Sequence, residues 1–116
     1  MIPTTERPPQ PPDEELMAPN RPRQYNLDQC YPDPFNPTTT ITYDLPFEST
    51  VRLKIFNLIG QVVATLTDKI EPAGHNVTEW DGSSFPSGIY FYRLDAVSTN
   101  DRRIAFSSVK KMVLCK

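Results

Sequence analysis

Apolar and polar residues alternate along most of the chain after residue 37, which is the pattern of a β-strand with one buried face. In the first such stretch, "TTTITYDLP", the side chains of Ile41, Tyr43 and Leu45 point one way and the polar residues between them point the other. The stretches "TVRLKIF" and "QVVATL" repeat the pattern on either side of the turn "NLIGQ", where Gly60 occupies the position most suited to a positive φ. These two stretches are therefore predicted to form a β-hairpin.

Three further strands are predicted in the second half of the chain. In "HNVTEW", Val77 and Trp80 lie three positions apart, so they can share one face only if the strand contains a β-bulge. The stretch "GIYFYRLDAV" is apolar on both faces, with Ile89 and Phe91 on one face and two tyrosines and Leu94 on the other. Such a strand is typical of the middle of a sheet. The last strand, "RIAFSSVKKMVLCK", follows the polar loop "STNDRR".

The pattern predicts an all-β protein. No stretch after residue 24 has apolar residues at helical spacing over three turns, and all four glycines fall in predicted turns. Six or seven short strands at this spacing predict an immunoglobulin-like antiparallel β-sandwich of six to seven strands with a Pro-rich extended N-terminal arm. The expected core consists of Tyr31, Phe35, Ile41, Tyr43, Leu53, Ile55, Val62, Leu66, Trp80, Ile89, Phe91 and Leu94.

Prolines concentrate before the first long strand. Residues 1–24 hold seven of the thirteen prolines and few large apolar side chains. We therefore expect them to form a semi-rigid arm or linker with few contacts to the sandwich of residues 25–116. The stretch "YPDPFNP" is expected to be a rigid, extended lead-in, with Tyr31 and Phe35 docked as anchors at the end of the sandwich.

Composition narrows the possible partners. The 116 residues have room for one domain and an extension, and the net charge of −2 gives no reason to expect nucleic acid or an anionic membrane as a partner. No apolar run approaches the roughly 20 residues that span a bilayer. The stretch "MIPTTERPPQPPDEEL" lacks the apolar core of a secretory signal. We therefore expect the chain either to stay where it is made or to be a piece of a longer protein.

The residues with reactive side chains do not form a recognisable active site. His75 is the only histidine, and it is expected in a turn or strand start, exposed to solvent. Asp81 and Asp95 are isolated carboxylates, and Asp81 with Gly82 is more typical of a turn. Trp80 is expected in the core rather than on a ligand-binding surface. The sequence therefore predicts no enzyme activity and no cofactor.

Cys30 and Cys115 lie near opposite ends of the predicted sandwich. Metal binding is not expected, because no Cys-x-x-Cys or Cys/His cluster accompanies them. They could form a disulfide, which would require the first and last strands to run antiparallel near these residues, or they could remain two unpaired thiols. The sequence leaves both alternatives open.

Five segments of the chain resemble a known family. In order, "YPDPFNPTTTITYDLP", "GQVVATL", "PAGHNVTEWDG", "PSGIYFYRL" and "KKMVLCK" are similar to the C-terminal sorting domain of the type IX secretion system, type A, over about residues 25–116. A related sandwich occurs in the flagellar hook-capping protein. The resemblance implies a domain that the outer-membrane translocon reads as an address, and a location outside the cell or on the outer-membrane surface. It also implies that the Pro-rich stretch joins the domain to a cargo.

Two functions follow. The first is the sorting module itself, a non-catalytic protein-interaction domain. The alternative is a small structural accessory subunit of a larger complex, which binds partner chains with the sandwich and with an arm of residues 1–37. In either case the partners are proteins. The candidate partner-binding residues are Lys110, Lys111, Met112, Val113, Leu114, Lys116, Tyr31 and Phe35.

The last strand is the main candidate because it carries the terminal motif of the family. An edge strand offers unpaired backbone groups to which a partner can add a strand. The competing interpretation is an ordinary edge strand that Lys110 and Lys111 protect from unwanted pairing.

Overall fold

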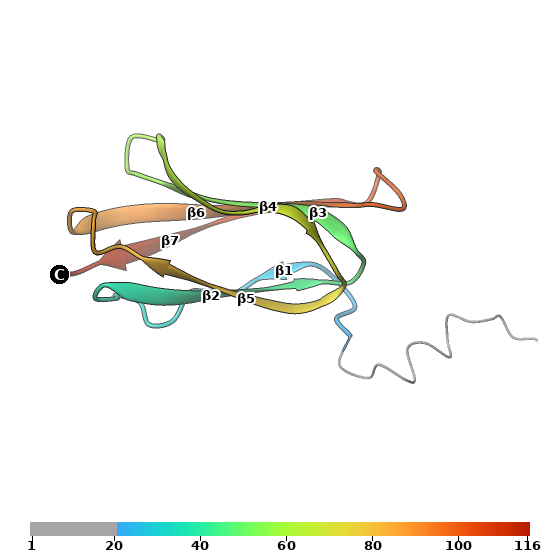
Figure 1. Cartoon of the computed structure of the whole chain (residues 1–116), viewed down its shortest axis with the longest axis horizontal. Helices are drawn as coiled ribbons and strands as arrows, with labels where there is room; N and C mark the ends of the chain where they lie inside the picture. The colour runs from blue at the N-terminus through green and yellow to red at the C-terminus, as the bar shows by residue number, and fades with distance from the viewer. Residues whose placement is uncertain (1–20) are drawn as a thin grey trace, which may run out of the picture.

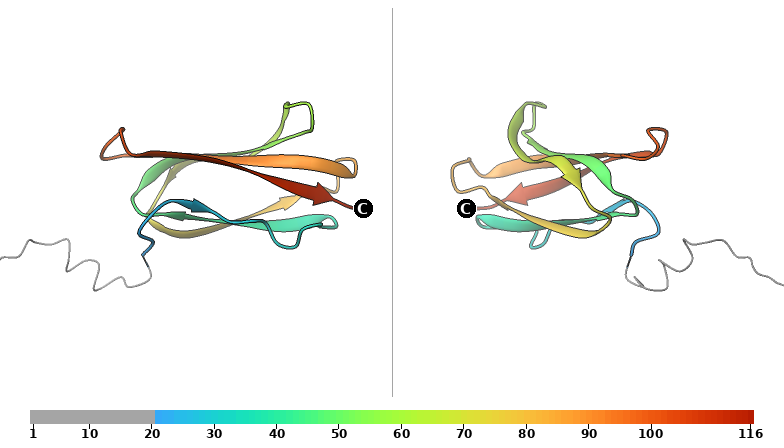
Figure 2. Two further views of the ribbon diagram at one scale, coloured as in Figure 1. Left: turned by 180° about the vertical axis from the view of Figure 1, so that it is seen from behind. Right: turned by 45° about the vertical axis from the view of Figure 1, so that its right-hand side comes forward.

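Residues 21–116, the part of the chain that this computed structural model describes, form two antiparallel β-sheets packed face to face (Figure 1). The strands are β1 (Asn26–Leu27), β2 (Thr38–Leu45), β3 (Ser49–Phe56), β4 (Val62–Glu71), β5 (Gly74–Asp81), β6 (Gly88–Ser98) and β7 (Ala105–Leu114). The smaller sheet has the order β1-β2-β5 and the larger has the order β4-β3-β6-β7. Figure 2 shows the same two layers from behind and in an oblique view. The prediction of an all-β sandwich is confirmed.

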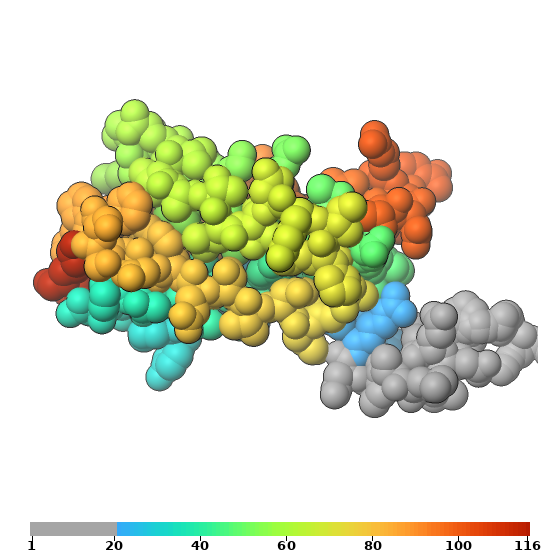
Figure 3. All heavy atoms as spheres, in the orientation of Figure 1, coloured from blue at the N-terminus to red at the C-terminus, as the bar shows by residue number. Residues whose placement is uncertain are grey.

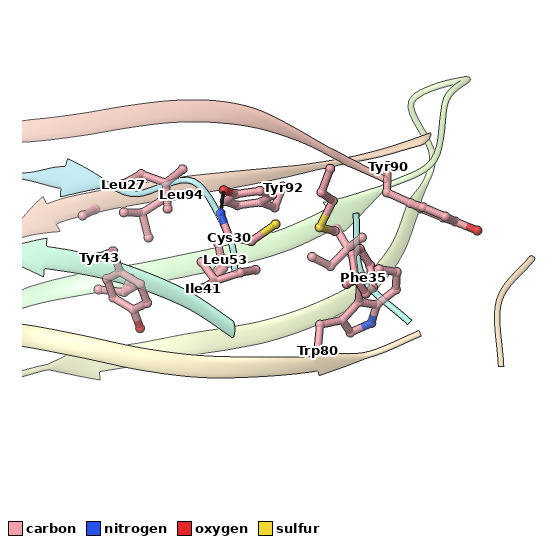
Figure 4. Packing of buried hydrophobic residues seen from close by; sticks show 14 of the residues in the cluster. Leu27, Cys30, Phe35, Ile41, Tyr43, Leu53, Trp80, Tyr90, Tyr92 and Leu94 are labelled. Carbon is pink, nitrogen blue, oxygen red and sulfur yellow. Dashed lines mark hydrogen bonds between the residues drawn. The ribbon is translucent and has the colours of Figure 1, made fainter. Parts of the chain in front are cut away.

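The core lies between the two sheets and is built from alternate residues of the strands (Figure 4). On β2, Ile41, Tyr43 and Leu45 are buried, and β3 and β6 contribute residues in the same alternating way. Trp80 closes one end of the core, with its ring centroid 5.7 Å from that of Phe35. The expected burial of Trp80 is confirmed.

Four of the residues expected in the core do not pack in it. Tyr31 is 81% exposed, Val62 and Ile89 are also exposed, and Phe91 is half-buried. The error on β6 has a simple cause. Its two tyrosines, Leu94 and an alanine face the core, and the strand period of two then places Ile89 and Phe91 on the outer face. The other members of the expected core are buried, except Leu66, which is partly buried against it.

The predicted turns and strand pairings hold, apart from the place of the bulge. The β3–β4 hairpin forms, Gly60 has a φ of 89°, and β6 lies inside its sheet as expected. Strand β5 pairs with β2 without a register shift, so Val77 and Trp80 lie on opposite faces. The register shifts occur instead between β3 and β4.

Residue Arg21 docks onto the sandwich. Its guanidinium donates two hydrogen bonds to the carbonyl of Pro46, at 3.0 and 2.8 Å, and lies over the ring of Phe47. Arg21 is therefore one point of contact between the expected arm and the sandwich, and the expectation of few contacts over residues 1–24 stays a prediction. The rest of the arm up to residue 20 lies outside the described residues.

Candidate functional site

Strand β7 is an edge strand, because it pairs only with β6 in the larger sheet. In an antiparallel ladder, every second residue of an edge strand directs its backbone N–H and C=O away from its neighbour. The carbonyl of Val113 accepts a hydrogen bond from the amide of Phe35 at 3.0 Å, and the amide of Cys115 donates to the carbonyl of Phe35 at 2.9 Å. The odd-numbered residues of β7 therefore direct their backbone groups outward.

Residues 29–35, which we name the covering segment, occupy the C-terminal half of this edge. The side-chain amide of Gln29 donates to the carbonyl of Lys111 at 2.8 Å, and a carboxylate oxygen of Asp33 accepts from the amide of Val113 at 2.9 Å. The same Gln29 amide donates to the second carboxylate oxygen of Asp33 at 2.8 Å. With the two hydrogen bonds of Phe35, these contacts use the carbonyl of Lys111, both backbone groups of Val113 and the amide of Cys115. A partner strand cannot pair there unless the covering segment moves.

The outward backbone groups of Ser107 and Val109 have no partner among residues 21–116. The side chain of Val109 is also 55% exposed. Residues 105–109 are thus the open part of the β7 edge.

Several contacts hold the covering segment in place. Phe35 is buried against Trp80, and Cys30 is buried in the core (Figure 4). The amide of Cys30 donates to the hydroxyl of Tyr92 at 2.8 Å, and that hydroxyl donates to the carbonyl of Asp28 at 2.7 Å. Burial raises the pKa of the Tyr92 phenol.

The covering segment also connects the two sheets. Tyr31 forms an isolated antiparallel bridge with Thr40 of β2, and Phe35 forms a parallel bridge with Leu114 of β7. Residues 31–37 bend rather than extend, with cis peptide bonds before their three prolines. Of the two expected anchors, Phe35 is buried and Tyr31 is not. The reason is that Cys30, the neighbour of Tyr31, takes the inward position.

The predicted contact residues of β7 divide between the two faces of the strand. Met112 and Leu114 are fully buried, so they have no surface to offer a partner while the domain is folded. Lys110 is half-buried on the same core-facing side, whereas Lys111 is exposed on the outer side. An inward-pointing lysine on an edge strand discourages pairing with other chains.

The outer side of the strand end includes Val113, which is half-buried. Lys116 follows the strand, and its side chain donates to the carbonyl of Ser83 at 2.8 Å. Partner contact by Lys110, Lys111, Val113 and Lys116 stays a prediction.

The two cysteines are free thiols in this structure. Cys30 faces the core and Cys115 is exposed just after the end of β7, so the disulfide considered from the sequence is not formed. Burial raises the pKa of the Cys30 thiol. No group of three His, Cys, Asp or Glu side chains within residues 21–116 is placed to hold a metal ion.

The remaining polar candidates serve turns and surface pairs. His75 is exposed on β5, with its Nδ1 2.7 Å from a carboxylate oxygen of Asp44. Asp81 is the last residue of β5, and it accepts a hydrogen bond from the amide of Ser83 in the following turn at 2.9 Å, which lowers the pKa of the aspartate. No helix in the described part of the chain could cross a membrane.

Sequence reasoning missed the roles of Gln29 and Asp33. Each contacts a residue of β7 that lies at least 80 positions away along the chain. The only local signal is that Asp33 stands between two prolines, which indicates a fixed backbone but names no partner. The open edge at Ser107 and Val109 was also missed, because nothing in the strand pattern shows where its edge is covered.

The fold and the partly covered edge strand define a small β-sandwich module. Residues 29–111 match the family described as the secretion system C-terminal sorting domain. Because the match covers more than half of the chain, the protein belongs to this family, and the resemblance to type IX sorting domains is confirmed. No curated protein and no solved structure compared with the chain matches it. The relation to the hook-capping protein stays a prediction.

Proposed function

We propose that the chain is a non-catalytic sorting module that a protein of the type IX secretion machinery recognises by adding a strand to residues 105–109. In this proposal residues 25–116 are the module, and residues 1–24 connect it to a cargo. The cargo is delivered outside the cell or to the outer-membrane surface. Membership of the sorting-domain family supports the general role.

The observation that supports this binding site is the division of the β7 edge into a covered part and an open part. Residues 111–115 are covered by Gln29, Asp33 and Phe35, while the backbone groups of Ser107 and Val109 are open. In strand addition, main-chain hydrogen bonds supply affinity and alternate side chains supply specificity. The open stretch offers free backbone groups for such hydrogen bonds, and it offers the exposed side chain of Val109 for specificity.

The other sheet edges are less suited to pairing. Strand β1 has only two residues, and the pairing of β4 with β3 is broken by two register shifts. Strand β5 places the charged side chains of Glu79 and Asp81 at exposed positions. Short strands, irregular strands and charged edges all discourage the addition of another strand.

The experiment fuses the full chain to the C-terminus of a reporter that is directed to the periplasm of a host with a type IX system. We expect the reporter to reach the cell surface or the medium only when the system is intact. Val109→Pro removes the outward N–H without breaking the ladder to β6. The variant should lower delivery of the reporter about tenfold, because the loss of about 1.4 kcal/mol of binding free energy weakens binding by that factor.

Val109→Ala is the matched control, because it shortens the side chain and keeps the N–H. It should be delivered nearly as well as the unaltered fusion. Equal delivery of the two variants, with unchanged melting temperatures, would reject strand addition at this site. An unaltered fusion that stays in the periplasm would reject the sorting function itself.

A further inference from the structure

The outer face of the larger sheet carries an apolar patch that is only partly covered within residues 21–116. Phe56 pairs across the sheet with Val62 on one side and Phe91 on the other, and Ile89 pairs with Val113. Ile89 is 38% exposed, Val62 is exposed, and the other three are half-buried. We name these five residues the outer patch. Contiguous apolar side chains on a surface usually mark an interaction site.

The β3–β4 hairpin extends the outer patch. Figures 1 and 3 show this hairpin, drawn in green to yellow-green, standing above the outer face of the larger sheet. Its tip carries Leu58 and Ile59, which are 66% and 78% exposed. Two aliphatic side chains so exposed at one turn lengthen the apolar surface that begins with Phe56 and Val62.

The tip of the hairpin is closed by its own hydrogen bonds. A side-chain oxygen of Asn57 accepts hydrogen bonds from the amides of Ile59 at 3.2 Å and Gln61 at 2.9 Å. The amide of Gly60 donates to the carbonyl of Asn57 at 3.0 Å. Leu58 and Ile59 are therefore presented on an ordered turn, so little conformational entropy is lost when a partner contacts them.

Positive charge borders the outer patch. Lys54 and Arg93 form the next rung of the sheet, and Lys111 pairs with Phe91. A groove of about 330 Å³ at the foot of the hairpin is lined by Arg52, Lys54, Phe56, Val62, Arg93 and Asp95. Its acid, Asp95, is paired with Arg93 at 2.9 Å, and neither Lys54 nor Lys111 forms an ion pair within residues 21–116.

We propose that the outer patch, with the hairpin tip, is a second docking surface for a protein segment that carries apolar side chains next to carboxylates. This inference rests on the proposed function, in which the partner is a component of the secretion machinery. The apolar side chains would lie on Phe56 and Phe91, and the carboxylates would face Lys54 and Lys111. Complementary charges of this kind favour encounter and fix the orientation of the two surfaces.

The geometry disfavours two other occupants. Phe56 and Phe91 are half-buried, with Lys54 and Arg93 on the next rung and Lys111 opposite Phe91, so an extended segment with carboxylates complements the patch better than an uncharged lipid surface does. A second copy would place the same patch against itself. The cations of both copies would then meet around the two-fold axis and repel each other.

The test uses the reporter fusion with the full chain. Phe91→Glu introduces a charge into the outer patch and should lower surface delivery at least about tenfold, as for a central contact residue. Val97→Glu is the matched control, since Val97 is half-buried on the same face of the same strand, at the other end of the sheet. It should keep delivery within about twofold. Charge reversal of Lys54 and Lys111 to Glu should lower delivery about threefold.

Equal delivery of the Phe91→Glu and Val97→Glu fusions would overturn the inference. If Phe91→Glu does not fold, as judged by the melting temperature of the purified chain, the charge-reversal variant decides, and its normal delivery would overturn the inference. Self-association of the unaltered chain that Phe91→Glu abolishes in sedimentation would assign the patch to a second copy. Binding to phosphatidylglycerol vesicles that the same change abolishes would assign it to lipid. Either result would overturn the proposal.

Failure of the unaltered fusion to be delivered is a different result. It would reject the proposed function and this inference together, whereas the outcomes above reject the second surface alone.

Discussion

The two halves of strand β7 have the same backbone geometry and the same neighbour, yet one half is closed and the other is open. Over residues 111–115 four outward groups bind Gln29, Asp33 and Phe35: the carbonyl of Lys111, the amide and carbonyl of Val113, and the amide of Cys115. Over residues 105–109 the corresponding groups meet no partner within the described chain. An edge strand can thus be protected from unwanted pairing over part of its length and remain available over the rest.

The difference arises from where the covering segment is anchored. Phe35 is buried against Trp80 at one end of the sandwich, and Cys30 is fixed by Tyr92 further inside. The segment between these anchors is short, so it reaches only the end of β7. Changes to the anchors should therefore have large effects, and changes to the open half should have small ones.

Of these changes, Phe35→Ala should cause the largest loss of stability. Removal of the buried ring should lower the free energy of unfolding by about 3 to 5 kcal/mol, because it leaves a cavity beside Trp80. Tyr31→Ala is the control, since Tyr31 is an aromatic residue of the same segment that faces solvent. It should change stability by less than about 0.5 kcal/mol. Denaturant unfolding measures both, and similar losses would show that Phe35 is not the anchor.

Tyr92→Phe should have the next largest effect. The amide of Cys30 would lose its buried acceptor, which should cost about 1 to 3 kcal/mol. Because burial raises the pKa of Tyr92 in the folded protein, the unfolded chain releases this proton first as the pH rises. Stability should then fall as the pH rises above about 10, the ordinary tyrosine pKa.

The pH dependence provides a second measurement of the same anchor. Urea unfolding at a series of alkaline pH values should show a shallower loss for Tyr92→Phe than for the unaltered chain. Part of the slope should remain, because burial raises the pKa of Tyr43 as well. Identical slopes for the two proteins would contradict the role given to the Tyr92 hydroxyl.

Asp33→Ala should have a smaller effect, about 1 kcal/mol, because the amide of Val113 lies near the surface and can bond to water instead. The sharper measurement is hydrogen exchange, in which the Val113 amide should lose protection. Asp33→Asn keeps an acceptor oxygen and should retain most of that protection. An amide of Val113 that exchanges at the same rate in all three proteins would remove Asp33 from the covering segment's contacts.

Val109→Pro should have the smallest effect on stability, within about 1 kcal/mol, because proline is tolerated where an edge N–H faces solvent. Val113→Pro is the matched change in the closed half, and it removes the N–H that Asp33 accepts. We expect it to be the more destabilising of the two in thermal unfolding. If Val109→Pro and Val113→Pro lower the melting temperature equally, the two halves of β7 do not differ as described.

The alternation of residues along the chain was enough to predict strands β2 to β7, the β3–β4 hairpin, the turn at Gly60 and the central position of β6, but not the two-residue β1. These features depend on neighbours in the sequence, because side-chain direction in a strand repeats every two residues. The motifs around them were also enough to indicate the sorting-domain family, which the match over residues 29–111 confirms.

The tertiary structure alone decided which face of β6 is covered. The sequence pattern separates Ile89 and Phe91 from Tyr90 and Tyr92, but both sets are apolar, and only the position of the second sheet selects the tyrosines for the core. The same limit applies to the edge of β7. Asp33 and Val113 are 80 residues apart, and no local propensity brings a carboxylate to a particular amide over that separation. Packing of Phe35 against Trp80 places them together, and so determines how much of the edge stays open.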